Sequence, residues 1–266
     1  MDERATETPN SLAEALPRAL AYLEIHGDDF DRARVGAASA KIEPPIPQNP
    51  DGGWPSGWSG GASSVFGTCQ VLDLLAGLDP VGVDQAAGLA FLAAMQSADG
   101  TWSEPPGAPG ADVPEWLLPG SSSARAYLTA YCARVFLVCG AGQEGPPHDA
   151  VERAAQALEW SLDPHGRLPG PLTAHWLAAR VFRATDRQLP ARRLLDVVGR
   201  QFDQLEVAEL ASFGADVDPG DRWAKRIAAR LLALQEPDGS WRAPDLSTAP
   251  FTAAVASTLS RIGHDE

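Results

Sequence analysis

Apolar residues recur along most of this chain with the period of an amphipathic helix, and Gly and Pro interrupt that period at intervals. Alternation of period two, which would indicate strands, is almost absent. The pattern therefore predicts an all-α protein of roughly ten helices. The predicted helices are Ser11 to His26, Gly61 to Leu78, Val83 to Gln96, Ser121 to Val138, Asp149 to Ser161, Pro171 to Thr185, Ala191 to Leu205, Val207 to Phe213, Asp221 to Gln235 and Thr248 to Ile262, with Arg32 to Ile42 as a short extra segment.

Two kinds of helix alternate in this pattern. Asp149 to Ser161 and Asp221 to Gln235 carry charge on one face, whereas Gly61 to Leu78, Ser121 to Val138 and Thr248 to Ile262 are small or apolar all round. A helix that is apolar on every side must be buried on every side. Pairs of one outer and one inner helix predict an (α/α) toroid of about five or six hairpins, with inner and outer rings, as a single domain over all 266 residues.

One heptapeptide pattern, Gln-x-x-Asp-Gly-x-Trp, occurs at Gln48 to Trp54, Gln96 to Trp102 and Gln235 to Trp241. Asp-Gly favours a tight turn because Asp bonds to the backbone ahead of it and Gly accepts positive φ. Gln and Trp are expected to pack across that turn, so that each copy staples two helices together. A degenerate copy at Leu162 to Leu168 keeps Gly166 but has Leu in place of Trp.

Composition and charge narrow the classes of function. The net charge of −14 argues against nucleic acid or an anionic membrane as a main partner, because both need a concentrated cationic surface. No apolar run reaches the ~18 to 20 residues of a membrane span, and the N-terminus is acidic, so we expect a cytoplasmic protein without stable membrane insertion. Cys69, Cys132 and Cys139 lie in apolar helical patterns without paired metal spacing and are expected to be buried free thiols.

The three heptapeptides resemble the QW repeats of squalene-hopene cyclases and other class II terpene cyclases, and of the wider α-toroid superfamily that includes the β subunits of protein prenyltransferases. The segments Gly61 to Thr68 and Pro250 to Ala254 are similar to the small-residue inner helices of that group. The resemblance covers most of the chain. It implies an isoprenoid cyclase, an isomerase or lyase in which protonation starts the cyclisation of a hydrophobic polyene inside a central, aromatic-lined cavity.

The acid of class II terpene cyclases is the central Asp of an Asp-x-Asp-Asp motif, which this chain lacks. The nearest match is Asp216-Val217-Asp218-Pro219, where Pro replaces the last Asp. Clustered carboxylates can raise one pKa, so Asp216 and Asp218 are candidate acids, and the alternative is an ordinary loop. His175, on a predicted inner helix, is a further candidate acid or base.

Aromatic faces stabilise cations, which a carbocation cascade requires. The candidate substrate-binding aromatics are Phe66, Tyr127, Tyr131, Trp176, Phe251, Trp58 and Trp116, with core packing as the alternative for those on helices. Arg125, near the start of a predicted inner helix, is a candidate for binding a diphosphate or carboxylate. Two long loops rich in Pro and Gly, Glu43 to Gly60 and Ser103 to Gly120, are either lids at one mouth of the toroid or insulation for its core.

No cofactor and no metal site is predicted. Asp28-Asp29-Phe30-Asp31 lacks the Asp-Asp-x-x-Asp spacing of magnesium-dependent diphosphate chemistry and is expected to be an acidic surface turn. The Asp-x-Cys signature of zinc prenyltransferases is missing. Mg²⁺ is expected as a cofactor only if the substrate is a diphosphate.

Two other functions remain open on the sequence. A non-catalytic α-toroid binding or partner protein fits the degenerate repeat and the missing catalytic motif. A carbohydrate-active toroid fits the Trp content, and it would need two carboxylates about 5 to 10 Å apart in an open groove. In the leading hypothesis the partner is a hydrophobic small molecule and the acidic, compact chain is a monomer.

Overall fold

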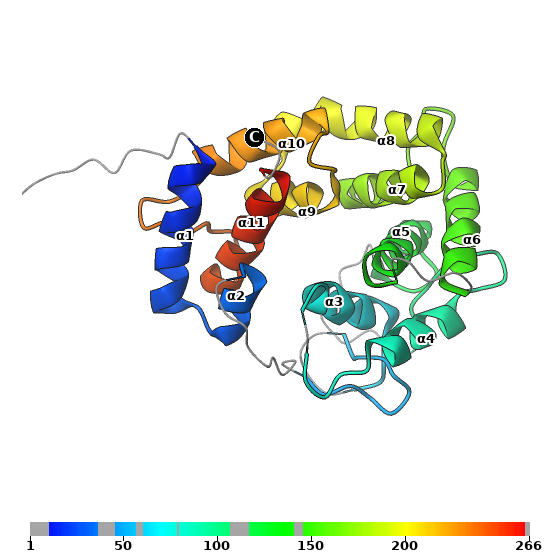
Figure 1. The fold of residues 1–266 in the computed structure, drawn as a ribbon. Coiled ribbons are helices and arrows are strands. Elements are labelled where there is room, and N and C mark those ends of the chain that lie inside the picture. The colour runs from blue at the N-terminus through cyan, green and yellow to red at the C-terminus, as the bar shows by residue number, and fades with distance from the viewer. Residues whose placement is uncertain are drawn as a thin grey trace, which may run out of the picture. The chain divides into compact units, whose positions relative to one another are not determined.

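Helices make up all the regular structure in the parts of the chain that the computed structural model describes. These are residues 11–36, 46–56, 61–78, 80–106, 117–140 and 146–263. Within them the chain forms eleven α-helices and a short 3-10 helix, and no strand (Figure 1). The predicted all-α fold class is confirmed.

The chain divides into two compact units. The middle unit is Glu43–Phe202, and the terminal unit joins Met1–Ile42 to Asp203–Glu266. Each unit contains both kinds of predicted helix, those that are apolar all round and those that carry charge on one face.

The middle unit holds six helices in two layers. They are α3 (Val65–Leu75), α4 (Gln85–Met95), α5 (Ser122–Cys139), α6 (Pro146–Trp160), α7 (Leu172–Ala184) and α8 (Gln188–Gln201). Helix α5 packs between α3 and α7, and α4, α6 and α8 each pack on the helix that precedes them in sequence. The inner helices of this unit are thus α3, α5 and α7.

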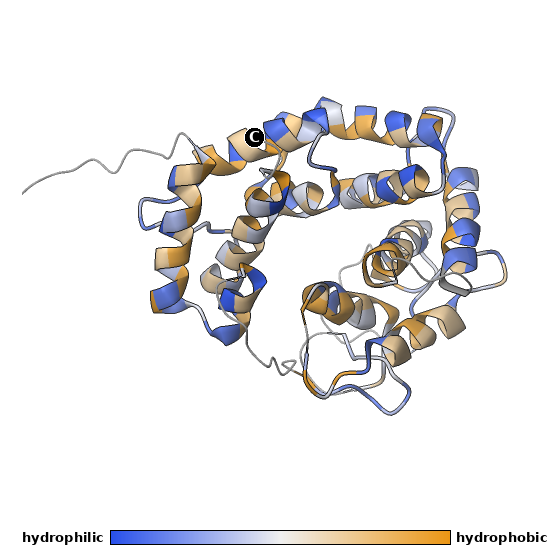
Figure 2. Cartoon of the chain, viewed as in Figure 1, coloured by the Kyte–Doolittle hydropathy of each residue, from blue (hydrophilic) through white to orange (hydrophobic). Residues whose placement is uncertain are grey.

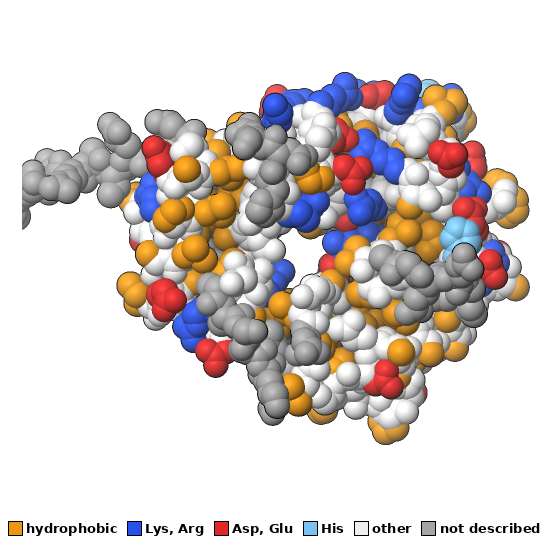
Figure 3. Space-filling view, in the orientation of Figure 1, with side chains coloured by type: hydrophobic (Ala, Val, Ile, Leu, Met, Phe, Trp, Pro, Cys, Tyr) orange, Lys and Arg blue, Asp and Glu red, His pale blue; other side chains and the backbone are white. Residues whose placement is uncertain are grey.

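Burial follows the sequence pattern in these layers. Most of α5 is buried, from Ala124 to Phe136, whereas α8 buries one face, with Leu194 and Val198 fully covered. Figure 2 shows the contrast as mixed blue and orange on α8 against a largely apolar α3. Basic side chains gather on the outer surface of α8, where Arg192 and Arg193 are exposed (Figure 3). Helix α5, which is apolar on most sides, is therefore buried on most sides, as the sequence predicts, whereas α4 buries only Gly88, Leu89 and Leu92 although it is also mostly apolar.

The terminal unit centres on the last helix. Its helices are α1 (Leu12–His26), α2 (Asp29–Arg34), α9 (Val207–Asp216), α10 (Arg222–Ala233) and α11 (Thr248–Ile262), with the 3-10 turn Phe202–Gln204 leading into it. Helix α11 packs against each of the other four helices. Segments from the two ends of the chain therefore share one core.

Two local predictions are wrong. The helix predicted at Arg32 to Ile42 begins earlier, as α2, and ends at Arg34, while residues 37–42 lie outside the described residues. The acidic run Asp28 to Asp31 is the start of this helix and not a turn, although Asp28 and Asp29 are exposed. Asp28 and Asp31 form a capping box, in which each side chain accepts from the other's backbone N–H, and Asp31 is buried. Helix α9 runs on to Asp216, so this residue ends a helix and does not lie in a loop.

The three stapled turns share one set of hydrogen bonds. In each, the Gln side-chain amide donates to the carbonyl of the motif's own Gly and to a carbonyl at the start of another helix. Gln48 reaches Gly52 at 2.7 Å and Asp84 at 2.9 Å, Gln96 reaches Gly100 at 3.0 Å and Ala150 at 2.9 Å, and Gln235 reaches Gly239 at 2.9 Å and Ala15 at 3.0 Å. The Gln therefore ties the turn to a helix that the motif does not contain.

Each motif Gly is needed for both conformation and space. Gly239 has φ of 91°, and a Cβ there would lie 2.4 Å from the carbonyl oxygen of Arg18. Gly100 is in the same position against the carbonyl of Arg153, with φ of 84°. No side chain fits between turn and helix, which is why the pattern keeps Gly.

The motif Trp is fully buried in all three copies. The indole N–H groups of Trp102 and Trp241 each donate to a carbonyl of the preceding helix at 2.7 Å. The degenerate copy keeps the turn, since the Gly166 N–H donates to the Asp163 carbonyl at 2.9 Å, and Leu168 fills the buried position of the Trp.

Candidate functional site

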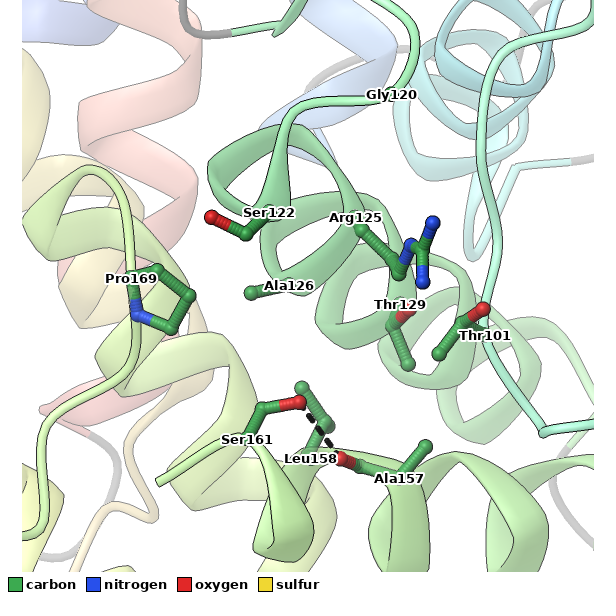
Figure 4. A pocket seen from close by; sticks show the side chains of 10 residues that line it. All are labelled: Thr101, Gly120, Ser122, Arg125, Ala126, Thr129, Ala157, Leu158, Ser161 and Pro169. Atoms are coloured by element: carbon green, nitrogen blue, oxygen red, sulfur yellow. Dashed lines mark hydrogen bonds between the residues drawn. The ribbon is translucent and has the colours of Figure 1, made fainter. Parts of the chain in front are cut away.

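A pocket of about 390 Å³ opens in the middle unit between the start of α5 and the end of α6 (Figure 4). Its walls come from the second stapled turn, the first turns of α5, the last turn of α6 and the degenerate turn. The lining residues are Thr101, Gly120, Ser122, Arg125, Ala126, Thr129, Ala157, Leu158, Ser161 and Pro169. The volume lies in the range of small-molecule sites.

Arg125 is the one charged residue of this lining. Its side chain is exposed and points from α5 toward the turn that carries Thr101 (Figure 4). The guanidinium makes no hydrogen bond to any residue that the structure describes. Hydrogen bonds from Thr101 lower the pKa of the nearby Asp99, and the charge of Arg125 lowers it further to a smaller extent. Within the part of the chain that the structure describes, no protein group therefore occupies the donors of Arg125.

The other walls combine hydroxyl groups with apolar surface. The Thr101 hydroxyl donates to Asp99 Oδ1 at 2.7 Å, and the Ser161 hydroxyl donates to the Ala157 carbonyl at 2.8 Å. Ser122 is exposed. Ala126, Leu158 and Pro169 form apolar surface beside them. Such a pocket suits a ligand with an anionic group and a short apolar portion.

A second, shallower pocket of about 260 Å³ lies on the outside of α6. Asp99, Glu152 and the exposed Trp160 line it, which is the combination that the carbohydrate hypothesis requires. Both carboxylates already have partners, because Asp99 accepts from Thr101 and Glu152 pairs with Arg187 at 3.0 Å. These groups are held in structural contacts, and the pocket does not favour glycoside hydrolysis.

Three predicted aromatic residues meet between α3 and α5. The ring centroid of Phe66 lies 6.2 Å from that of Tyr127 and 6.3 Å from that of Tyr131, and the centroids of the two tyrosine rings lie 5.7 Å apart. Both tyrosines are buried, and burial raises their pKa values. The Tyr131 hydroxyl is 3.3 Å from Asp73, which also pairs with Arg134. Within the described residues this cluster packs as core.

Glu104 is a buried carboxylate whose role no pattern in the sequence indicates. It is 5% exposed and accepts from the backbone N–H groups of Phe66 at 2.7 Å and Val65 at 3.0 Å. Burial raises the pKa of Glu104, and these hydrogen bonds oppose that rise. The side chain holds the N-terminus of α3, where a negative charge is favourable. Its only signal in sequence is its place two residues after Trp102.

His175 lies in the first turn of α7 and is 4% exposed. Its Nδ1 is 3.3 Å from the Pro171 carbonyl, and Nε2 has no hydrogen-bond partner among the described residues. Burial lowers the pKa of His175, with a smaller opposing effect of the hydrogen bond. The imidazole is neutral at pH 7, which suits a base or a core residue better than an acid. The adjacent Trp176 is buried.

The remaining candidates are not among the residues that line this pocket. Asp216, Asp218 and Phe251 belong to the terminal unit; Asp216 and Phe251 are buried there and Asp218 is exposed. Trp58 and Trp116 fall outside the described residues.

Two negative findings apply to the described ranges. They contain no group of three or more His, Cys, Asp or Glu side chains placed to bind a metal ion. None of their helices combines the length and the apolar composition that crossing a membrane requires.

Comparison with known proteins shows a similarity in fold to a solved structure. No protein-family model and no curated protein matches the sequence. The crystal structure of a protein from Actinoplanes is similar, with a TM-score of 0.59 and 16% sequence identity over 95% of this chain and 100% of that chain. At this identity the likeness shows a shared fold over nearly the whole length of both chains.

Proposed function

We propose that this chain is a terpene-cyclase-like α-toroid protein that binds an isoprenoid and holds its anionic head group at Arg125. The observation that carries the proposal is the exposed guanidinium of Arg125 in the pocket at the start of α5. Two features of that pocket support it, as does the resemblance of the stapled turns to QW repeats.

The first feature is the electrostatics of the pocket. A guanidinium offers planar, paired donors that match a phosphate or carboxylate. Arg125 stands one turn into α5, and the lining residues Gly120 and Ser122 flank the first N–H groups of this helix. The positive end of the helix dipole therefore adds to the charge of Arg125.

The second feature is the apolar side of the pocket, formed by Ala126, Leu158 and Pro169. An inorganic anion would gain nothing from this surface, whereas the first isoprene unit next to a diphosphate would bury apolar area against it. The QW resemblance selects isoprenoids among amphipathic anions. Mg²⁺ would accompany a diphosphate ligand and would not require a protein metal site.

Cyclisation by protonation is the chemistry that the resemblance implies, and it stays a prediction for this chain. Its candidate acids are Asp216, which is buried at the end of α9, and Asp218, which is exposed. Because burial keeps His175 neutral, we assign it the role of a base if it takes part. Closure of the helix pairs into a toroid is part of the same proposal.

The test is a calorimetric titration of the purified protein with farnesyl diphosphate, with and without Mg²⁺. Loss of the charge-assisted hydrogen bonds in Arg125→Gln should weaken Kd by about 10- to 100-fold. Arg125→Lys, which keeps the charge without the paired donors, should fall between. Arg192→Gln, an exposed Arg on α8, is the matched control and should bind as the wild type does. Equal affinity of Arg125→Gln and wild type, or no binding by either, would refute the proposal.

A non-catalytic binding protein is the second candidate, and one observation favours it. Glu104, a buried carboxylate that accepts from the backbone N–H of Phe66, is already engaged by three donors at the N-terminus of α3, so it is not placed to protonate a ligand. Binding of farnesyl diphosphate without any product would support this candidate, and it would leave the assignment of Arg125 unchanged.

A further inference from the structure

Two of the three cysteines lie in direct contact inside the middle unit. The Sγ atoms of Cys69 on α3 and Cys132 on α5 are 3.4 Å apart, and both residues are fully buried. A disulfide has an S–S bond of about 2.05 Å, so the two sulfur atoms need to approach by little more than 1 Å. Side-chain rotation and a small shift of the two helices can provide this.

Cys139 does not compete for either partner. It lies two turns after Cys132 on α5 and is half-buried, and its Sγ is 3.5 Å from the carbonyl oxygen of Leu72. The spacing of seven residues places both α5 thiols toward α3, but only Cys132 meets a second thiol. The structure therefore selects one pair.

We infer that Cys69 and Cys132 form a reversible disulfide site that links α3 to α5 under oxidising conditions. The inference is independent of the proposed isoprenoid binding.

The oxidant is a peroxide, here hydrogen peroxide, which is little larger than water. One thiol, as its thiolate, attacks a peroxide oxygen, giving a sulfenic acid and releasing one water. The second sulfur attacks the sulfenic sulfur, forms the S–S bond and displaces the second water. Two thiols and one peroxide thus become one disulfide and two waters, with two electrons passing from sulfur to oxygen.

The environment makes this reaction slow but selective. Burial raises the pKa of Cys132 well above its usual value, so little Cys132 thiolate is present and its oxidation is slow. Once one thiol is oxidised, the other is already in contact with it, and no other nucleophilic sulfur touches the pair among the described residues. Disulfide formation should therefore be faster than further oxidation of the sulfenic acid.

The bridge would have a local effect on the aromatic cluster. Phe66 stands one turn before Cys69 on α3, and Tyr127 and Tyr131 precede Cys132 on α5. The bridge would also constrain the unfolded chain over a separation of 63 residues. Oxidation should therefore raise Tm, by about 5 °C or more if the bridge forms without strain.

The test exposes the wild-type protein to millimolar hydrogen peroxide, blocks remaining thiols with iodoacetamide in denaturant, and maps the peptides by mass spectrometry. We expect a Cys69–Cys132 crosslinked peptide, with the intact mass lower by about 2 Da, alkylated Cys139, a higher Tm, and full reversal by dithiothreitol. Cys139→Ser should form the same bridge, and Cys69→Ser should form none.

Alkylation of both Cys69 and Cys132 after peroxide treatment would overturn the inference, as would pairing of either with Cys139. So would sulfinic acid at Cys132 in place of the bridge. The peptide map of the wild type decides among these outcomes even if a serine variant fails to fold.

Discussion

The backbone N–H of Trp241 donates to the hydroxyl oxygen of Thr252 on α11 at 3.1 Å. The other two stapled turns repeat this bond, with Trp54 reaching Thr68 on α3 at 3.0 Å and Trp102 reaching Thr129 on α5 at 3.1 Å. A buried Thr on the following inner helix is therefore a fifth member of the motif. Gln, Gly, Trp and Thr together connect each turn to its surrounding helices.

Thr252→Val should destabilise the protein by about 1–3 kcal/mol, because the variant keeps the shape of Thr and leaves the buried N–H of Trp241 without an acceptor. Urea unfolding monitored by circular dichroism measures the change. Thr248→Val is the control on the same helix, since Thr248 bonds to none of the described residues through its hydroxyl. Equal stability of the two variants would mean that the Trp–Thr bond contributes little.

Gly239→Ala should cost more than the conformational strain of positive φ alone. Gly82 has φ of 73° with open space around it, so Gly82→Ala measures the strain term, about 1 kcal/mol. Gly239→Ala adds a clash with the Arg18 carbonyl, and we expect a further loss of about 1–3 kcal/mol. Comparison of the two unfolding free energies isolates the contact between turn and α1. A similar loss in both variants would contradict the close approach.

The sequence predicts the stapled turns and the helix types because both rest on local rules. Asp-Gly turns and helical periodicity need no knowledge of distant segments. The sequence does not reveal the Thr partners, because they lie at different separations, 14, 27 and 11 residues after the Trp. The helix that each Gln ties down, such as α1 for Gln235, lies up to 220 residues away, and no pattern within the turn specifies it.

The candidate site was predicted only in part, for a similar reason. The sequence indicates Arg125 because a charge is unusual on an inner helix, and this residue does line a pocket. The remaining walls come from turns and from the end of α6, and only tertiary packing brings these together. Glu104 looked like an ordinary loop residue, since its role depends on the position of the α3 N-terminus.

His175 should give the protein a measurable pH dependence. Because burial lowers its pKa in the folded state, the unfolded state takes up the proton first as the pH falls, so stability falls with it. The loss should begin near pH 6.5 and reach at most about 1.4 kcal/mol per pH unit. Arg167 strengthens the lowering, and Asp163 opposes it.

Unfolding free energies of wild type and His175→Gln at pH 7.5, 6.5 and 5.5 test this expectation. The variant should lose less stability over that interval than the wild type. His165→Gln, at an exposed position, should retain the wild-type dependence. Parallel curves for wild type and His175→Gln would show that this histidine does not titrate differently in the two states.

Asp216→Asn and Asp218→Asn test the protonation chemistry. If one of these residues is the acid, its variant should bind ligand normally but form cyclic product at least ~100-fold more slowly, since proton transfer is lost. The substrates are farnesyl diphosphate, geranylgeranyl diphosphate and squalene, with products analysed by mass spectrometry. Asp149→Asn, at an exposed position on α6, is the control. Unchanged product formation in both variants would exclude them as the acid.

The position of a bound ligand tests the central claim most directly. A crystal structure of the protein with farnesyl thiodiphosphate, an unreactive diphosphate analogue, would show where the anionic group binds. We predict a phosphate oxygen about 3 Å from the Arg125 guanidinium, with the first isoprene unit against Leu158 and Pro169. A diphosphate bound elsewhere, or an empty pocket at saturating ligand, would contradict the account.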